Sequence, residues 1–234
     1  MKTIGIIGGI SWLSSIEYYR LMNEMVRERL GGLNSAEILM YSIPFGPFSE
    51  QERLAEHANW EQLNRVMIDA AQRLKSGGAD FIVIASNTMN SVAHLIESSV
   101  KIPVLHIADA TGTKIKAEGL QRVGLLGTSY TMAHHFYRDR LEKRYGLKIV
   151  TPTKTEREYI NNVIFDELCA GKILDSTRVE FIKIINRLVQ EKEAEAVILG
   201  CTEIPLLVKQ EHVKTRLYDT AAIHSEAAIE YAME

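Results

Sequence analysis

Two segments of this sequence place a small, chemically reactive side chain directly after a run of aliphatic residues. One run, Phe-Ile-Val-Ile-Ala, ends at Ser86, and the other, Ala-Val-Ile-Leu-Gly, ends at Cys201. Continuous apolar runs of this length are typical of strands buried on both faces of a parallel sheet, and ligands bind at the carboxyl ends of such strands. We therefore expect Ser86 and Cys201 at matching strand ends, from which they could act on two faces of one atom.

Cys201 is the candidate for acid–base chemistry. It follows Gly200 and precedes Thr202 and Glu203 in a segment that should open a helix, and amides at a helix N-terminus lower the pKa of a thiol. On position alone, Cys201 is equally well interpreted as a small, buried hydrophobic side chain without a chemical role. The second cysteine, Cys169, continues an apolar helical series and is expected to be structural.

Polar turns accompany both candidate strand ends. Asn87 and Thr88 follow Ser86 and could offer amide and hydroxyl groups to a carboxylate, while residues 128–131 (Thr-Ser-Tyr-Thr) form the equivalent turn in the second half. The alternative reading of both turns is an ordinary cap of the helix that follows. No G-x-S-x-G sequence surrounds Ser86, so a hydrolase nucleophile is not expected.

The sequence lacks the signatures of a nicotinamide-cofactor site and of a metal site. The glycine-rich segment 5–9 lacks the G-x-G-x-x-G fingerprint, so a nicotinamide cofactor is not expected. It is read as a strand-to-helix turn whose amides can approach an anion. His134 and His135 are adjacent, which is poor spacing for metal ligands, and we expect both side chains to be solvated.

Composition narrows the class of protein. The 234 residues are 46% hydrophobic and carry a formal charge of −3, with a pI near 6.2. Neither nucleic acid nor a membrane surface is therefore an expected partner. No signal peptide or transmembrane stretch is evident, and two cysteines give no disulfide framework. These features indicate a soluble, cytoplasmic globular protein.

Strand-like runs alternate with helical patterns along the chain, which predicts βαβ units and mainly parallel sheets. Helical patterns are clearest at 14–30, 57–76, 177–192 and 221–233. The stripe expected to be buried in the first helix comprises Ile16, Tyr19, Leu21, Met22, Met25, Val26 and Leu30. The expected strands are 3–7, 36–43, 80–85, 102–107, 122–127, 147–150, 195–200 and 215–218.

The second half of the chain repeats the pattern of the first. Residues 122–128 resemble residues 3–9, and each restart is followed 70–80 residues later by the strand that ends at Ser86 or Cys201. We therefore predict an α/β fold of two pseudo-symmetric Rossmann-like lobes with mainly parallel sheets and an active-site cleft between the lobes. The predicted N-terminal lobe is 1–115 plus 210–234, and the C-terminal lobe is 116–209.

Six motifs, in order along nearly the whole chain, together resemble the aspartate/glutamate racemase family, in particular its cofactor-independent amino-acid racemases of enteric bacteria. The resemblance implies two α/β lobes, an amino-acid substrate, no requirement for pyridoxal phosphate or metal, and a homodimer. The motifs are residues 4–11, 87–89, 105–111 (Leu-His-Ile-Ala-Asp-Ala-Thr), 126–132, 200–204 (Gly-Cys-Thr-Glu-Ile) and 219–224 (Asp-Thr-Ala-Ala-Ile-His).

The resemblance also implies residue roles. Two groups flank the α-carbon: one removes its proton while the other delivers a proton to the opposite face. By motif match, Ser86 takes the first of these positions and Cys201 the second. The candidate substrate-binding residues are Gly9, Ile10, Ser11, Asn87, Thr88, Thr128, Tyr130, Thr131, Thr202 and Glu203.

This sequence departs from the family pattern at four positions. Ser86 stands where the family has Cys or Thr, Asn90 where it has His, Leu13 where it has Glu, and Tyr159 where many relatives have Lys. Because a serine hydroxyl is a much weaker acid than a thiol, we expect unequal activity toward the two enantiomers. Two alternatives stay open: a single-thiol decarboxylase or isomerase of the same fold, and a catalytically impaired amino-acid-binding homologue.

Overall fold

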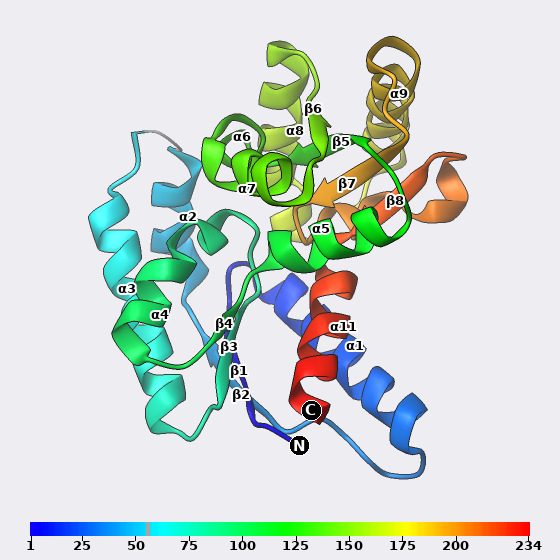
Figure 1. Ribbon diagram of the computed structural model, residues 1–234. Coiled ribbons are helices and arrows are strands. Elements are labelled where there is room, and N and C mark those ends of the chain that lie inside the picture. The colour runs from blue at the N-terminus through cyan, green and yellow to red at the C-terminus, as the bar shows by residue number, and fades with distance from the viewer. Residues whose placement is uncertain (55–56) are drawn as a thin grey trace. The chain divides into compact units, whose positions relative to one another are not determined.

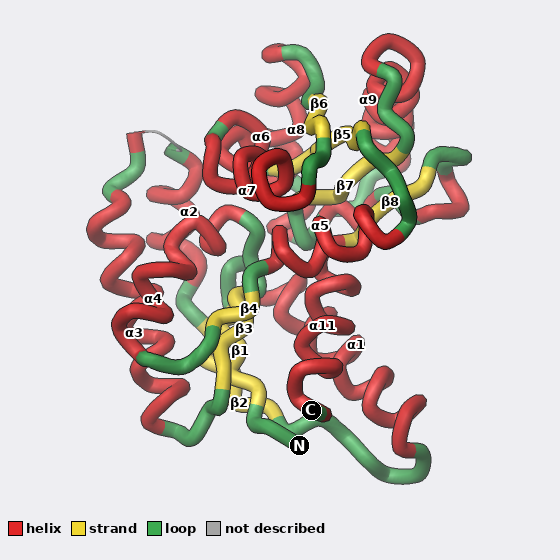
Figure 2. The backbone as a smooth tube through the Cα atoms, viewed as in Figure 1, coloured by secondary structure: helices red, strands yellow, loops and turns green. Residues whose placement is uncertain are grey.

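The computed structural model describes residues 1–54 and 57–234, which form two compact units (Figure 1). The first unit consists of Met1–Ala110 and Ala221–Glu234, and the second of Thr111–Thr220. Each contains one four-stranded sheet with flanking helices (Figure 2). No helix in the described ranges combines the length and apolarity needed to cross a bilayer.

The first unit is built on a parallel sheet in the order β2-β1-β3-β4. Its strands are β1 (Ile4–Gly8), β2 (Ile38–Ser42), β3 (Phe81–Ile84) and β4 (Val104–Leu105). Its helices are α1 (Trp12–Leu30), α2 (Phe45–Arg53), α3 (Trp60–Ser76), the 3-10 turn η2 (Thr88–Val92), α4 (Ala93–Val100), the start of α5 (Ile107–Ala117) and most of α11 (Thr220–Met233).

Helices cover both faces of this first sheet (Figure 1). One apolar cluster joins α3 and α4 to sheet residues such as Ile82 and Ile84, and a second joins α1 and α11 to Ile4, Ile6 and Phe81. A sheet covered on both faces requires strands that are apolar throughout. This requirement explains the uninterrupted run before Ser86.

The second unit repeats this arrangement with a parallel sheet in the order β6-β5-β7-β8. Its strands are β5 (Arg122–Gly127), β6 (Lys148–Val150), β7 (Ala196–Gly200) and β8 (Arg216–Asp219). Its further helices are α6 (Ser129–Ala133), α7 (His135–Tyr145), α8 (Lys154–Asp166), η3 (Leu168–Ala170), α9 (Asp175–Lys192), α10 (Ile204–Leu207) and η4 (Gln210–His212).

The predicted fold class is confirmed. Every predicted strand is present, all described strand pairs are parallel, and both sheets have their second strand at one edge beside their first. The run 102–107 contributes only the two residues of β4, since α5 already begins at Ile107. The shared strand order is the structural counterpart of the sequence repeat.

The boundaries between the units differ from the predicted ones. The predicted first lobe includes residues 210–234, but β8 within this range pairs with β7, with Tyr218 opposite Ile198. Strand pairing therefore keeps this segment in the second unit, and the chain returns to the first unit only at Ala221. The first boundary lies after Ala110 rather than after residue 115.

The predicted buried stripe of α1 is partly wrong. Tyr18, Met22 and Val26 are fully buried, whereas Ile16 and Tyr19 are 51% and 55% exposed. The helix turns its Tyr18 face toward the sheet. The exposed side chains line a shallow apolar groove with β2, about 350 Å³ in volume.

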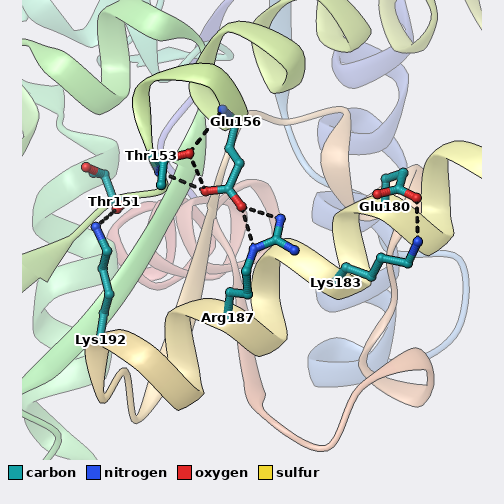
Figure 3. Close-up of polar contacts among 7 residues, drawn as sticks. All are labelled: Thr151, Thr153, Glu156, Glu180, Lys183, Arg187 and Lys192. Carbon is teal, nitrogen blue, oxygen red and sulfur yellow. Dashed lines mark hydrogen bonds and ion pairs between the residues drawn. The ribbon is translucent and has the colours of Figure 1, made fainter.

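Helices α8 and α9 are joined by polar contacts centred on Glu156 (Figure 3). Thr153 and Glu156 form a capping box, in which the Thr153 backbone N–H donates to Glu156 Oε2 at 2.8 Å. Arg187 Nε on α9 donates to Oε1 of the same carboxylate at 2.6 Å. Partial burial raises the pKa of Glu156, but hydrogen bonds from Thr153 and Arg187 outweigh burial, and the net pKa is lowered.

Replacing Glu156 with Gln is expected to lower the free energy of unfolding by about 1 kcal/mol at pH 7. Because the folded-state pKa is depressed, this stabilisation is present above the ordinary value of 4.5 and is lost as the pH falls through the folded value. Urea unfolding at several pH values measures it. Glu180→Gln, which removes an exposed pair with Lys183, is the control and should change stability by less than about 0.5 kcal/mol. If the difference in unfolding free energy between Glu156→Gln and wild type does not become smaller below pH 4.5, this account is contradicted.

Candidate active site

The ends of β1 and β3 bring two predicted site segments together in the first unit. Ile7 pairs with Ile84, and the Ala85 N–H donates to the Ile7 carbonyl at 3.0 Å. The segment 9–11 after β1 and the segment 86–88 after β3 therefore leave the same edge of one sheet. Gly9 has φ +81°, and a Cβ there would lie 2.3 Å from the Ile43 carbonyl oxygen, so the turn after β1 requires glycine.

Serine hydroxyls hold the turn after β1. The Gly9 N–H donates to Ser15 Oγ at 2.8 Å, and Ser15 Oγ donates to the Ser11 carbonyl at 3.1 Å. Ser14 Oγ donates to the same carbonyl at 3.0 Å. The Ser11 hydroxyl itself is buried and has no hydrogen-bond partner within the described ranges. The sequence comparison indicated only the loss of a carboxylate at Leu13 and a substrate-binding role for Ser11, and it did not predict this network of serine hydroxyls.

The turn after β3 carries Ser86, which is 6% exposed. Its Oγ accepts a hydrogen bond from the Met89 N–H at 3.3 Å. Asn87 precedes η2 and Thr88 begins it, and both side chains are buried. The hydroxyl thus lies in a tight local turn, and Asn87 and Thr88 follow it immediately.

Asn90 fixes this turn, a role that sequence reasoning missed. Its Nδ2 donates to the Ser86 carbonyl at 2.7 Å and to the Ile84 carbonyl at 3.2 Å, while its Oδ1 accepts from the Ile107 N–H at 3.1 Å. The buried amide therefore ties the end of β3 to the start of α5. The sequence comparison indicates only that an imidazole is absent at this position.

His224, in the last of the six motifs, holds another part of this unit. Its Nε2 lies 2.9 Å from the Leu105 carbonyl, and its Nδ1 lies 3.0 Å from the Tyr18 hydroxyl. Because a carbonyl only accepts, Nε2 carries the proton and Nδ1 accepts from Tyr18. Burial lowers the pKa of His224 to about 4, so the ring is neutral at pH 7. The contact joins α11 to Leu105, the last residue of β4.

The second unit brings its predicted segments together in the same way. Gly127 at the end of β5 pairs with Gly200 at the end of β7. A Cβ on Gly127 would lie 2.7 Å from the Gly200 carbonyl oxygen, and one on Gly200 would lie 2.8 Å from the Leu126 carbonyl oxygen. This close approach sets the turn that begins at Thr128 beside the turn that begins at Cys201.

The turn after β5 is a capped helix start. Thr128 Oγ1 accepts from the Thr131 N–H at 3.2 Å, and the Ser129 N–H donates to Asn161 Oδ1 on α8 at 2.9 Å. Tyr130 stacks on His134 with ring centroids 3.9 Å apart. The prediction that both adjacent histidines are solvated is therefore wrong for His134, whose ring lies in an aromatic stack.

The turn after β7 joins a thiol to a carboxylate. Cys201 Sγ donates to Glu203 Oε2 at 3.0 Å, and Thr202 Oγ1 donates to the same oxygen at 3.0 Å. Cys201 is 7% exposed and Glu203 is 3% exposed. Glu203, predicted only as a substrate-binding residue, contacts the proposed acid/base directly.

The expected lowering of the Cys201 pKa by helix amides is wrong. Burial, reinforced by the neighbouring Glu203 charge, raises the pKa of the thiol well above its ordinary value, and the Glu203 backbone N–H opposes this more weakly. The next helix, α10, is a four-residue segment that begins only at Ile204. The resting thiol is consequently protonated at neutral pH.

Within residues 1–54 and 57–234, no three His, Cys, Asp or Glu side chains gather in a way that could hold a metal ion. Neither Cys169 nor Cys201 forms a disulfide within these residues, and Cys169 is partly exposed. The groups that the described strand-end turns present are amides, hydroxyls, one thiol and one carboxyl group.

Each unit has a parallel sheet with the same strand order, and small polar residues follow its first and third strands. These features define a doubly wound α/β protein with a pair of strand-end turns in each unit. This chain belongs to the Asp/Glu/Hydantoin racemase family, whose sequence profile matches residues 7–228. Membership of this family supports an amino-acid racemase function, which is an isomerase activity.

Three related proteins match this chain over all or nearly all of their length. An aspartate racemase homologue from Pyrococcus horikoshii is 36% identical, with a TM-score of 0.84 and full coverage of both chains. A Yersinia pestis protein provisionally named an Asp/Glu racemase is 42% identical, with a TM-score of 0.88 and full coverage of both chains. The broad specificity amino-acid racemase of Bacillus subtilis is 22% identical over 97% of this chain and 96% of that protein.

Replacing Asn90 with Ala is expected to lower the free energy of unfolding by about 2–4 kcal/mol, because buried carbonyl and amide groups lose their partners. Urea unfolding monitored by circular dichroism measures the change. Ser91→Ala is the matched control, since the adjacent hydroxyl has no hydrogen-bond partner in the described chain, and it should stay within about 0.5 kcal/mol of wild type. Equal effects of the two substitutions would contradict the clamp assigned to Asn90.

Proposed function

We propose that this protein is a cofactor-independent amino-acid racemase that removes and returns the proton of the substrate α-carbon. Cys201 is the main acid/base and Ser86 acts on the opposite face. The observation that carries the proposal is the Cys201 thiol at the end of β7, hydrogen-bonded to a buried carboxylate in a chain of the racemase family. Neither pyridoxal phosphate nor a metal is part of this mechanism.

The polar turns supply substrate binding in this proposal. Deprotonation at the α-carbon delocalises negative charge onto the α-carboxylate, and hydrogen-bond donors aimed at that group stabilise the transition state. In the first unit the donors come from segments 9–11 and 87–88. In the second unit, Thr128, Tyr130, Thr131 and Thr202 have this role. The same groups hold the α-carboxylate and α-amine in one orientation, which makes proton transfer intramolecular.

Ser86 makes the two faces of the reaction unequal. A serine hydroxyl is a far weaker acid than a thiol, and its one described hydrogen bond, from the Met89 N–H, lends little stabilisation to an alkoxide. Two enantiomers have the same free energy in water, so net interconversion must have equal kcat/KM in both directions. The inequality therefore appears as exchange of the α-proton without inversion, faster for the enantiomer whose proton faces Cys201.

The test is α-proton exchange in heavy water, followed by NMR over both enantiomers of a panel of amino acids. Wild-type protein, dialysed against a chelator and treated with a carbonyl reagent, is expected to exchange at least one amino acid, with one enantiomer exchanging faster. Cys201→Ala is expected to reduce exchange by about 10²-fold or more, the scale of a lost general base. Cys169→Ser is the matched control and should retain exchange.

Exchange that survives in Cys201→Ala would contradict the proposal. Amino-acid binding without exchange in the wild type would favour the catalytically impaired homologue. Loss of CO₂ from a substituted malonate, with no exchange in any amino acid, would favour the single-thiol decarboxylase.

We further propose that the protein is a homodimer, as its family resemblance implies. The chain has a mass of 26.4 kDa, so light scattering coupled to size exclusion is expected to give twice that mass. A single-chain mass at micromolar concentration would contradict this expectation.

A further inference from the structure

The sequence motif 219–224 ends in His224, a buried side chain that the proposed function does not use. His224 and Tyr18 are both 0% exposed, and both nitrogens of the imidazole are paired. The neighbours Ala228 and Ile229 on the same helix belong to the apolar cluster that packs on β1. A buried polar ring costs free energy that an apolar side chain avoids, so its hydrogen bonds distinguish His224 from these neighbours.

The hydrogen bonds of His224 hold the end of β4. Nε2 donates to the Leu105 carbonyl at 2.9 Å, and Nδ1 accepts from the Tyr18 hydroxyl at 3.0 Å. The second bond supports the first, because a donor at Nδ1 keeps the ring proton on Nε2, where the carbonyl accepts it. Tyr18 on α1 and His224 on α11 therefore fix one backbone carbonyl together.

The Leu105 carbonyl lies two residues before a group that supports the Ser86 turn. The Ile107 N–H donates to Asn90 Oδ1 at 3.1 Å, and Asn90 Nδ2 donates to the Ser86 carbonyl at 2.7 Å. The intervening His106 accepts a hydrogen bond from a backbone N–H of α5 at 3.1 Å through its Nδ1, so this short link is itself fixed. A continuous set of buried hydrogen bonds thus connects α11 and α1 to the Ser86 turn.

Resting on the proposed function, we propose that Tyr18 and His224 are positioning residues for Ser86. Their hydrogen bonds fix the end of β4, and hence the backbone N–H that keeps the Asn90 amide against the Ser86 turn. In this role neither side chain contacts the substrate, and no proton passes between them and Ser86. A hydroxyl that serves one face of the α-carbon depends on its position, since misplacement by about 1 Å can slow a reaction about 10²-fold.

The proposal predicts a larger change in one of two rates. All residues of the network belong to the first unit, whereas Cys201 follows β7 of the second. Exchange of the α-proton at the Cys201 face needs only Cys201, but inversion also needs Ser86 at the opposite face. Loss of the network should therefore slow inversion more than exchange. A substitution that only reduces the folded fraction lowers both rates by the same factor, so their ratio separates positioning from stability.

The test measures the ratio of inversion to exchange in heavy water, for the faster-exchanging enantiomer of an amino acid that the wild type accepts. NMR follows exchange and chiral chromatography follows inversion. His224→Phe keeps an aromatic ring but loses both nitrogens, and it is expected to lower the ratio about tenfold or more. His224→Gln can still donate an N–H to the carbonyl and is expected to restore most of the ratio. Ser225→Ala is the matched control, since this neighbouring buried hydroxyl has no hydrogen-bond partner in the described chain, and it should leave the ratio unchanged.

Tyr18→Phe is the second variant, and it decides the question if His224→Phe fails to fold. It removes one oxygen and releases the tautomer of His224, so the ratio should again fall. A ratio that stays at the wild-type value in these variants, or that falls equally in Ser225→Ala, would overturn the positioning role and leave the proposed function standing. A wild type that exchanges without inverting would remove the role of Ser86 and overturn this inference with it. A wild type that exchanges no amino acid would refute the proposed function itself, and the positioning role with it.

Discussion

Hydrogen bonding between the first and third strands of each sheet is the constraint on which the candidate site depends. In the first unit the ladder joins Ile7 to Ile84, and in the second it joins Gly127 to Gly200. Neighbouring parallel strands end at the same edge of their sheet, so the chain must leave both strands there with small, polar turns. The Gly127–Gly200 contact leaves no room for a Cβ on either residue. The reactive side chains are thus positioned by backbone pairing before any side-chain contact is made.

Buried polar groups then fix each turn. Asn90 satisfies two carbonyls and one amide around Ser86, and Ser15 bridges Gly9 to Ser11. In the second unit, the Cys201 thiol and the Thr202 hydroxyl both donate to one oxygen of the Glu203 carboxylate. Buried polar groups cost free energy unless they are paired, so these networks hold a turn in one geometry. The two units use different chemistry: a neutral amide network surrounds the hydroxyl, whereas a buried carboxyl group lies beside the thiol.

Much of this fold follows from pattern alone. Strand-like runs located every strand in the described residues. The pattern is clearest for β1, β3 and β7, which are buried throughout, because strands in the middle of a sheet covered on both faces need continuous apolar runs. The face of α1 was predicted less well, since Ile16 and Tyr19 are apolar yet lie on the exposed side. Periodicity counts apolar residues but does not identify which stripe meets the sheet. The position of β8 failed for a related reason, because a short strand does not indicate which sheet it joins.

The sequence by itself determined the family, the α/β class, the strand-end locations of Ser86 and Cys201 and the polar residues beside them, since these depend on local order along the chain. Only the tertiary structure decided the acidity of Cys201 and the roles of Asn90 and Glu203. A pKa depends on burial and on the charges within a few ångströms, and a hydrogen-bond partner depends on side-chain direction. Residue types and spacing do not specify either quantity. Glu203 is two residues from Cys201 in the sequence, but only the fold of the turn brings its carboxylate onto the sulfur.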